Sequence, residues 1–81
     1  MDKKTYKKLC KIRKKIVKIM ESDLSAEHKY ARIFCEKISR KVFALARFPY
    51  WDPDASYEED VQAFVDQFIE HMEDLDEMFS I

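Results

Sequence analysis

The chain has 81 residues, a formal net charge of −1 and an apolar fraction of 47%, and it contains no glycine. This composition disfavours intrinsic disorder, hairpin-rich sheets and Gly-rich phosphate-binding loops. No stretch approaches the roughly 20 apolar residues of a membrane span, and the basic N-terminus is not followed by the apolar run of a signal peptide. We therefore predict a single all-α domain over residues 1–81, located in the cytoplasm with reduced cysteines.

The first helix is predicted over residues 3–21, and Asp2 is a suitable N-cap. Apolar residues recur at steps of three and four on one side, while lysines cover the other side. Arg13 falls within the apolar side, where an arginine needs a carboxylate partner. The predicted core face consists of Tyr6, Leu9, Cys10, Ile16, Val17 and Met20, with Ile12 and Ile19 on its flank.

A second helix is predicted over residues 26–47, with Ser25 as its N-cap. Pro49 disfavours helical geometry at the residue before it, so the helix should end near Arg47. Ile33 and Phe43 fall outside the core face at helical spacing, and we expect both on the outer surface. The predicted core face consists of Tyr30, Ala31, Phe34, Cys35, Ile38, Val42 and Leu45.

A third helix is predicted over residues 57–79. Ser56, just before the helix, and Glu59, in its first turn, have the spacing of a capping box. Its apolar stripe consists of Val61, Phe64, Val65, Phe68, Met72, Leu75 and Phe79. Three helices with two connectors predict a small antiparallel three-helix bundle with up-down-up topology, in which the first and third helices run parallel. The core of so short a chain is small, so a dimer is an alternative to a monomer.

The charges are segregated along the chain. Residues 1–21 carry a net charge of +7, residues 25–47 carry +4 and residues 52–81 carry −11. Either the basic helices neutralise the acidic one internally, or separate faces bind charged partners. The acidic cluster on the third helix would need a second cluster to hold Mg²⁺, and the first two helices lack one. We therefore expect no metal site, no cofactor, no small-molecule substrate and no enzymatic activity.

The function predicted from these features is binding. The leading hypothesis is a non-enzymatic interaction protein, an adaptor or inhibitor of phage or plasmid accessory type, that binds another protein or a second copy of itself. Hot spots of interfaces are enriched in Tyr, Trp and Arg, and the expected contact residues are Ile33, Phe43, Tyr50, Trp51, Arg40 and Arg47. The alternative is a nucleic-acid-binding regulatory protein, with phosphates held by Lys7, Lys11, Lys14, Lys18 and Arg32. No membrane partner is expected.

Overall fold

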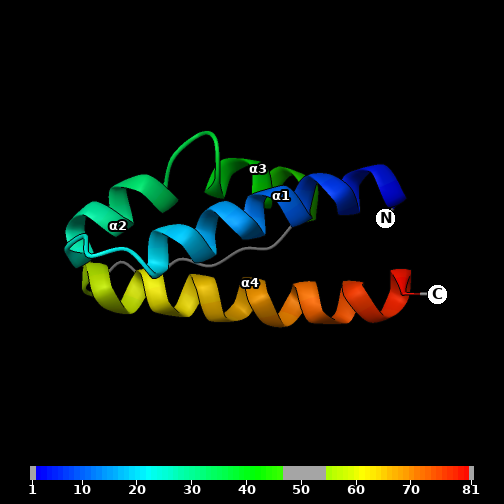
Figure 1. Cartoon of the computed structure of the whole chain (residues 1–81). Coiled ribbons are helices and arrows are strands. Elements are labelled where there is room, and N and C mark those ends of the chain that lie inside the picture. The colour runs from blue at the N-terminus through cyan, green and yellow to red at the C-terminus, as the bar shows by residue number, and fades with distance from the viewer. Residues whose placement is uncertain (1, 47–54, 81) are drawn as a thin grey trace.

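The computed structural model describes residues 2–46 and 55–80. In this part of the chain the regular secondary structure is all helix, with no strand, which confirms the all-α prediction (Figure 1). The helices are α1 (Lys3–Met20), α2 (Ala26–Ile33), α3 (Ser39–Ala46) and α4 (Tyr57–Phe79). The long helix α4 packs against α1 and α2, and α3 packs against α1.

Three of the helices begin at the caps that the sequence predicts. The Asp2 carboxylate accepts the first-turn Thr5 N–H of α1 at 2.7 Å. The Ser25 hydroxyl accepts the His28 N–H of α2 at 3.3 Å. At the start of α4, Ser56 and Glu59 form a complete capping box, in which each side chain accepts the backbone N–H of the other. These caps satisfy N–H groups that have no partner inside a helix.

The core confirms the predicted stripe of α4 and shifts the buried face of α1. The fully packed residues of α4 are Val61, Phe64, Val65, Phe68, Met72 and Leu75. On α1 the buried residues are Leu9, Ile12 and Ile16, so Ile12 belongs to the core and not to its flank. Val17, predicted to face the core, is 37% exposed. The buried arc of α1 is therefore rotated toward Ile12.

The prediction of a single second helix is wrong, because this segment forms two short helices, α2 and α3, and the described residues form four helices instead of three. The chain leaves helical geometry at Phe34, where ψ is 67°. The carbonyl of Cys35 then accepts the backbone N–H groups of Ile38 and Arg40 and the Ser39 hydroxyl, which offsets the helical bonds lost at the break. The break also has a packing consequence. In one continuous helix Ile33 would point about 180° away from Val42, yet both are fully buried.

The predicted direction of the last helix is also wrong. The Tyr6 ring stacks on Phe79 with centroids 4.7 Å apart, so the start of α1 lies beside the end of α4. Tyr30 of α2 lies 4.8 Å from Tyr57, at the start of α4. Helix α4 is therefore antiparallel to α1 and runs in the same direction as α2 (Figure 1). The prediction took the second and third helices as antiparallel neighbours, but α3 and α4 run in the same direction, and α4 begins at the end of the molecule where α2 begins (Figure 1).

Candidate functional site

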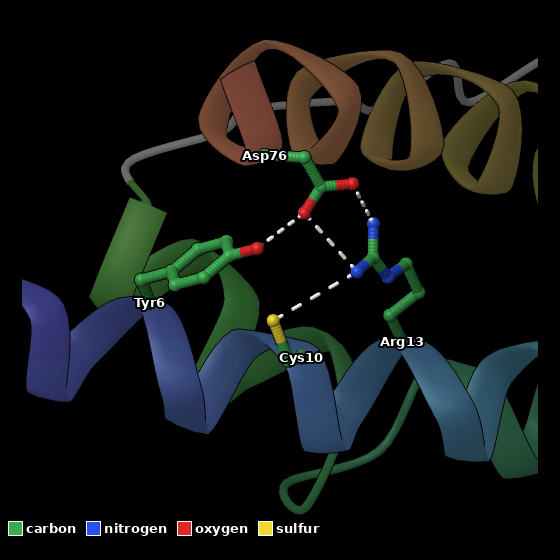
Figure 2. Close-up of polar contacts among 4 residues, drawn as sticks. All are labelled: Tyr6, Cys10, Arg13 and Asp76. Carbon is green, nitrogen blue, oxygen red and sulfur yellow. Dashed lines mark hydrogen bonds and ion pairs between the residues drawn. The ribbon is translucent and has the colours of Figure 1, made fainter. Parts of the chain in front are cut away.

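A polar cluster joins α1 to the last turns of α4 (Figure 2). The guanidinium of Arg13 donates to both carboxylate oxygens of Asp76, at 2.7 and 3.2 Å. The Tyr6 hydroxyl donates to the same carboxylate. The guanidinium also donates weakly to the Cys10 sulfur at 3.8 Å. The carboxylate partner that the sequence requires for Arg13 is therefore Asp76, within the same chain.

The hydrogen bonds of this cluster shift the pKa values of Asp76 and Tyr6, and the bond to Asp76 also raises the pKa of Arg13. Donation from Arg13, and then from Tyr6, holds the pKa of Asp76 below its usual range. The bond to that negative carboxylate raises the pKa of Tyr6 to about 12, with a smaller contribution from Cys10. Arg13, Tyr6 and Asp76 thus satisfy one another and hold two helices together. The cluster acts as a structural cross-link, and its cation is not available to an external ligand.

A basic groove runs between α1 and the arm formed by α2 and α3. It consists of two hollows with volumes of about 320 and 390 Å³. The first hollow is lined by Lys8, Lys11, Ile12, Lys15, Lys37, Lys41, Ala44 and Leu45. The second is lined by Lys15, Lys18, Ile19, Ser22, Leu24, Arg32 and Ile38. Because Lys15 borders both hollows, they adjoin along α1.

The cations of the basic groove lie along its two sides. On α1, Lys8, Lys11, Lys15 and Lys18 recur at steps of three, four and three, which places them on one face of a helix. At 1.5 Å per residue, this row is roughly 15 Å long. On the other side, Lys41, Lys37 and Arg32 follow in the opposite chain direction. An object lying in the groove would therefore meet positive charge on both flanks.

The apolar residues of the groove are all aliphatic. Ile12 and Ile38 are buried, Ile19, Leu24 and Leu45 are half-buried, and Ala44 is exposed. Among residues 2–46 and 55–80, no aromatic side chain lines either hollow. In its described part the groove therefore offers an aliphatic surface with cations along it.

The cations of the groove form no ion pair with the described residues. Neither ion pair formed by residues 2–46 and 55–80, Arg13–Asp76 and Arg40–Glu36, involves a cation of the groove. Helix α4, which has nine acidic side chains and no basic one, contributes no residue to either hollow. The basic helix α1 and the acidic helix α4 thus form a single ion pair, Arg13–Asp76, in the described part of the chain.

The structure rearranges the predicted partner-binding residues. Ile33 is fully buried in the core, so its predicted position on the outer surface is wrong. Phe43 is half-buried and meets the Phe64 ring edge-on at 5.7 Å, so it too packs inward. The cause is the break after α2, which reorients both short helices. Arg40 is exposed and pairs with Glu36, while Arg47, Tyr50 and Trp51 lie outside the described residues.

The predicted nucleic-acid-binding residues divide into two groups. Lys11, Lys18 and Arg32 line the basic groove, whereas Lys7 and Lys14 lie on α1 away from it. Helical spacing on α1 could have separated these groups, but it could not identify Lys37 and Lys41 as the opposite side. That pairing depends on how α3 packs on α1, and the break that sets it has no glycine or proline to reveal it.

Among the described residues, no three His, Cys, Asp or Glu side chains gather closely enough to hold a metal ion. None of the described helices has the length and apolar character that a bilayer crossing requires. The chain matches no protein-family model, no curated protein and no solved structure.

Proposed function

We propose that this chain is a small, non-enzymatic binding protein that recognises an acidic partner protein through the basic groove. The observation that carries this proposal is the groove itself: seven cations without ion-pair partners among the described residues border an aliphatic surface. Cys10 and Cys35 are free thiols, which suits the reducing cytoplasm where we propose that the protein acts.

The placement of charge on α1 supports a binding role, because it lowers the stability of the helix. Lys3 and Lys4 occupy the first turn, where the helix dipole favours acidic residues, and no acidic residue is present there. Lys11 and Lys15 are one turn apart, and like charges at that spacing destabilise a helix by about 0.2–0.5 kcal/mol. An acidic partner would turn this repulsion into attraction, whereas water alone leaves the cost in place.

The aliphatic part of the groove favours a protein over a nucleic acid. Phosphates gain from the lysines but not from covering the half-buried Leu24 or Leu45. Nonspecific single-strand binders generally add aromatic stacking platforms, and none of the described residues that line the groove is aromatic. A protein segment with both acidic and apolar side chains would use both parts of the surface. Nucleic-acid binding stays the second candidate, because Lys11, Lys18 and Arg32 all line the groove.

The test compares two triple variants of the same helix with equal loss of charge. The groove variant carries Lys8→Gln, Lys11→Gln and Lys15→Gln. The control variant carries Lys3→Gln, Lys7→Gln and Lys14→Gln, none of which lines either hollow. Each is immobilised and exposed to nuclease-treated host extract. The proposal predicts a protein that the wild type and the control variant retain and the groove variant loses.

Two outcomes would contradict the proposal. Equal loss from both variants would mean that net charge, and not the groove, attracts the protein. A gel shift at about 0.1 M salt provides the second outcome, because exposed charges further than roughly 10 Å apart are screened there. Tight retention of duplex or single-stranded nucleic acid, abolished in the groove variant, would establish the nucleic-acid function in its place.

A further inference from the structure

We infer that the basic groove receives an acidic amphipathic α-helix of about three turns, supplied by a different protein. This inference rests on the proposed function and names the chemistry of the partner. The row from Lys8 to Lys18 is roughly 15 Å long, which is the length of about ten helical residues. Such a helix could extend across both hollows.

The arrangement of charge selects a helix over an extended strand. The groove presents lysines on the α1 side, cations on the α3 side and aliphatic groups between them. A matching ligand therefore needs one apolar stripe with acidic side chains on both flanks. An amphipathic helix provides this, because residues beside its apolar stripe project to either side. In a strand with alternating pattern, the acidic side chains point away from the apolar face.

The backbone of the groove leads to the same conclusion. Extended ligands commonly bind by adding a strand to an exposed sheet edge, which supplies hydrogen bonds to their backbone. Both sides of this groove are helices and the connecting break, and the described residues contain no strand. A helical ligand needs no such edge, because its own backbone groups are already paired.

A second copy of this chain does not fit the groove. Its acidic amphipathic helix is α4, whose charge suits the lysines. The apolar stripe of α4 is already buried in its own core, including Phe64, Phe68 and Met72. A folded copy would offer the acidic side of α4, but the apolar stripe of that helix would stay in its own core and could not cover Leu24 and Leu45. The occupant is therefore a helix whose apolar stripe is exposed before binding.

The experiment uses two synthetic peptides of identical composition, Leu, Ala and Glu. One places Leu at helical spacing with Glu on both flanks, and the other alternates Leu and Glu. Fluorescence anisotropy at about 0.15 M salt measures each against the wild-type protein. We expect the helical pattern to bind at least about tenfold more tightly than the alternating one, with a gain of helical circular dichroism on binding.

Protein variants then locate the bound peptide. The groove variant should weaken binding by about tenfold or more, whereas the control variant should change it only by the screened long-range effect of charge. Leu24→Ser provides an apolar probe, since Leu24 lines the groove and lies outside the main hydrophobic core. It should weaken the helical peptide more than the alternating one. Thermal melts of each variant confirm that the fold is intact.

The possible failures separate the inference from the proposed function. Equal binding of both peptides would overturn the inference that the ligand is helical, but the proposal of an acidic partner protein would stand. Failure of both peptides, with a groove-dependent protein still recovered from extract, would do the same. Peptide binding that is unaffected by the groove variant would overturn the site. Groove-dependent binding of nucleic acid without peptide binding would overturn both the inference and the proposed function.

Discussion

Replacing Asp76 with Asn tests the polar cluster that joins α1 to α4. The variant keeps the shape of the side chain but removes its charge, and with it the two-point contact to Arg13. The Arg13 and Asp76 side chains are 26% and 39% exposed. The pair therefore lies between exposed ion pairs, worth about 0–1 kcal/mol, and buried ones, whose disruption costs about 3–5 kcal/mol. We expect a loss of about 1–1.5 kcal/mol in the free energy of unfolding.

The pH dependence of this loss follows from the lowered pKa of Asp76. The folded pKa lies below the value of 3.8 that an unperturbed carboxyl has. The ionised form therefore stabilises the folded state above that pH, and the contribution is lost as pH falls through the folded value. The difference between wild type and Asp76→Asn should be constant from neutral pH to about pH 5 and should shrink below about pH 4.

Urea and thermal unfolding, followed by far-UV circular dichroism, provide the measurement. For a domain of this size, 1 kcal/mol corresponds to about 4–8 °C in Tm. Glu36→Gln is the matched control, because it breaks the highly exposed Arg40–Glu36 pair, whose side chains are 75% and 82% exposed. That change should cost no more than about 0.5 kcal/mol. Equal costs for the two variants, or a cost of Asp76→Asn that persists undiminished in acid, would refute the argument.

Three further predictions concern the core, a cap and a tyrosine. Ile33→Ala should cost about 2–4 kcal/mol in chemical denaturation, because Ile33 is fully buried; a cost near zero would return it to the surface. Ser56→Ala should cost about 1 kcal/mol in the same assay by removing one half of the capping box. In a spectrophotometric titration, Tyr6 should ionise near its raised pKa of about 12, and Asp76→Asn should bring it back toward 10. Because its folded pKa is raised, Tyr6 contributes stability below about pH 10 that is lost as pH rises toward 12.

Local patterns in the sequence predict the individual helices well. The capping box and the stripe from Val61 to Leu75 define α4, because both depend on residues only three or four positions apart. The same is true of the caps Asp2 and Ser25. The need of Arg13 for a carboxylate was also evident, since an arginine on an apolar face must be paired. These features could be predicted because the interactions that produce them are local.

The arrangement of the helices could not be predicted in this way. Helical spacing extends through Ile33 and Val42 as if they belonged to one helix, and no glycine or proline marks the break between them. Its stability comes from tertiary packing, which buries both side chains. The choice of Asp76, among the eleven acidic residues after residue 51, depends on the antiparallel direction of α4. The basic groove depends on the break between α2 and α3, so the sequence could predict only the row of lysines on its α1 side.

The polar cluster also has a kinetic consequence. It joins Tyr6 and Arg13 to a residue 70 and 63 positions away in the chain. Closing so long a loop brings an entropic cost that must be met before the contact returns any energy. The rings of Tyr30 and Tyr57, which join α2 to α4, close a much shorter loop. Docking of α1 should therefore be a late event in folding, so that loss of the cluster chiefly accelerates unfolding and leaves the folding rate nearly unchanged.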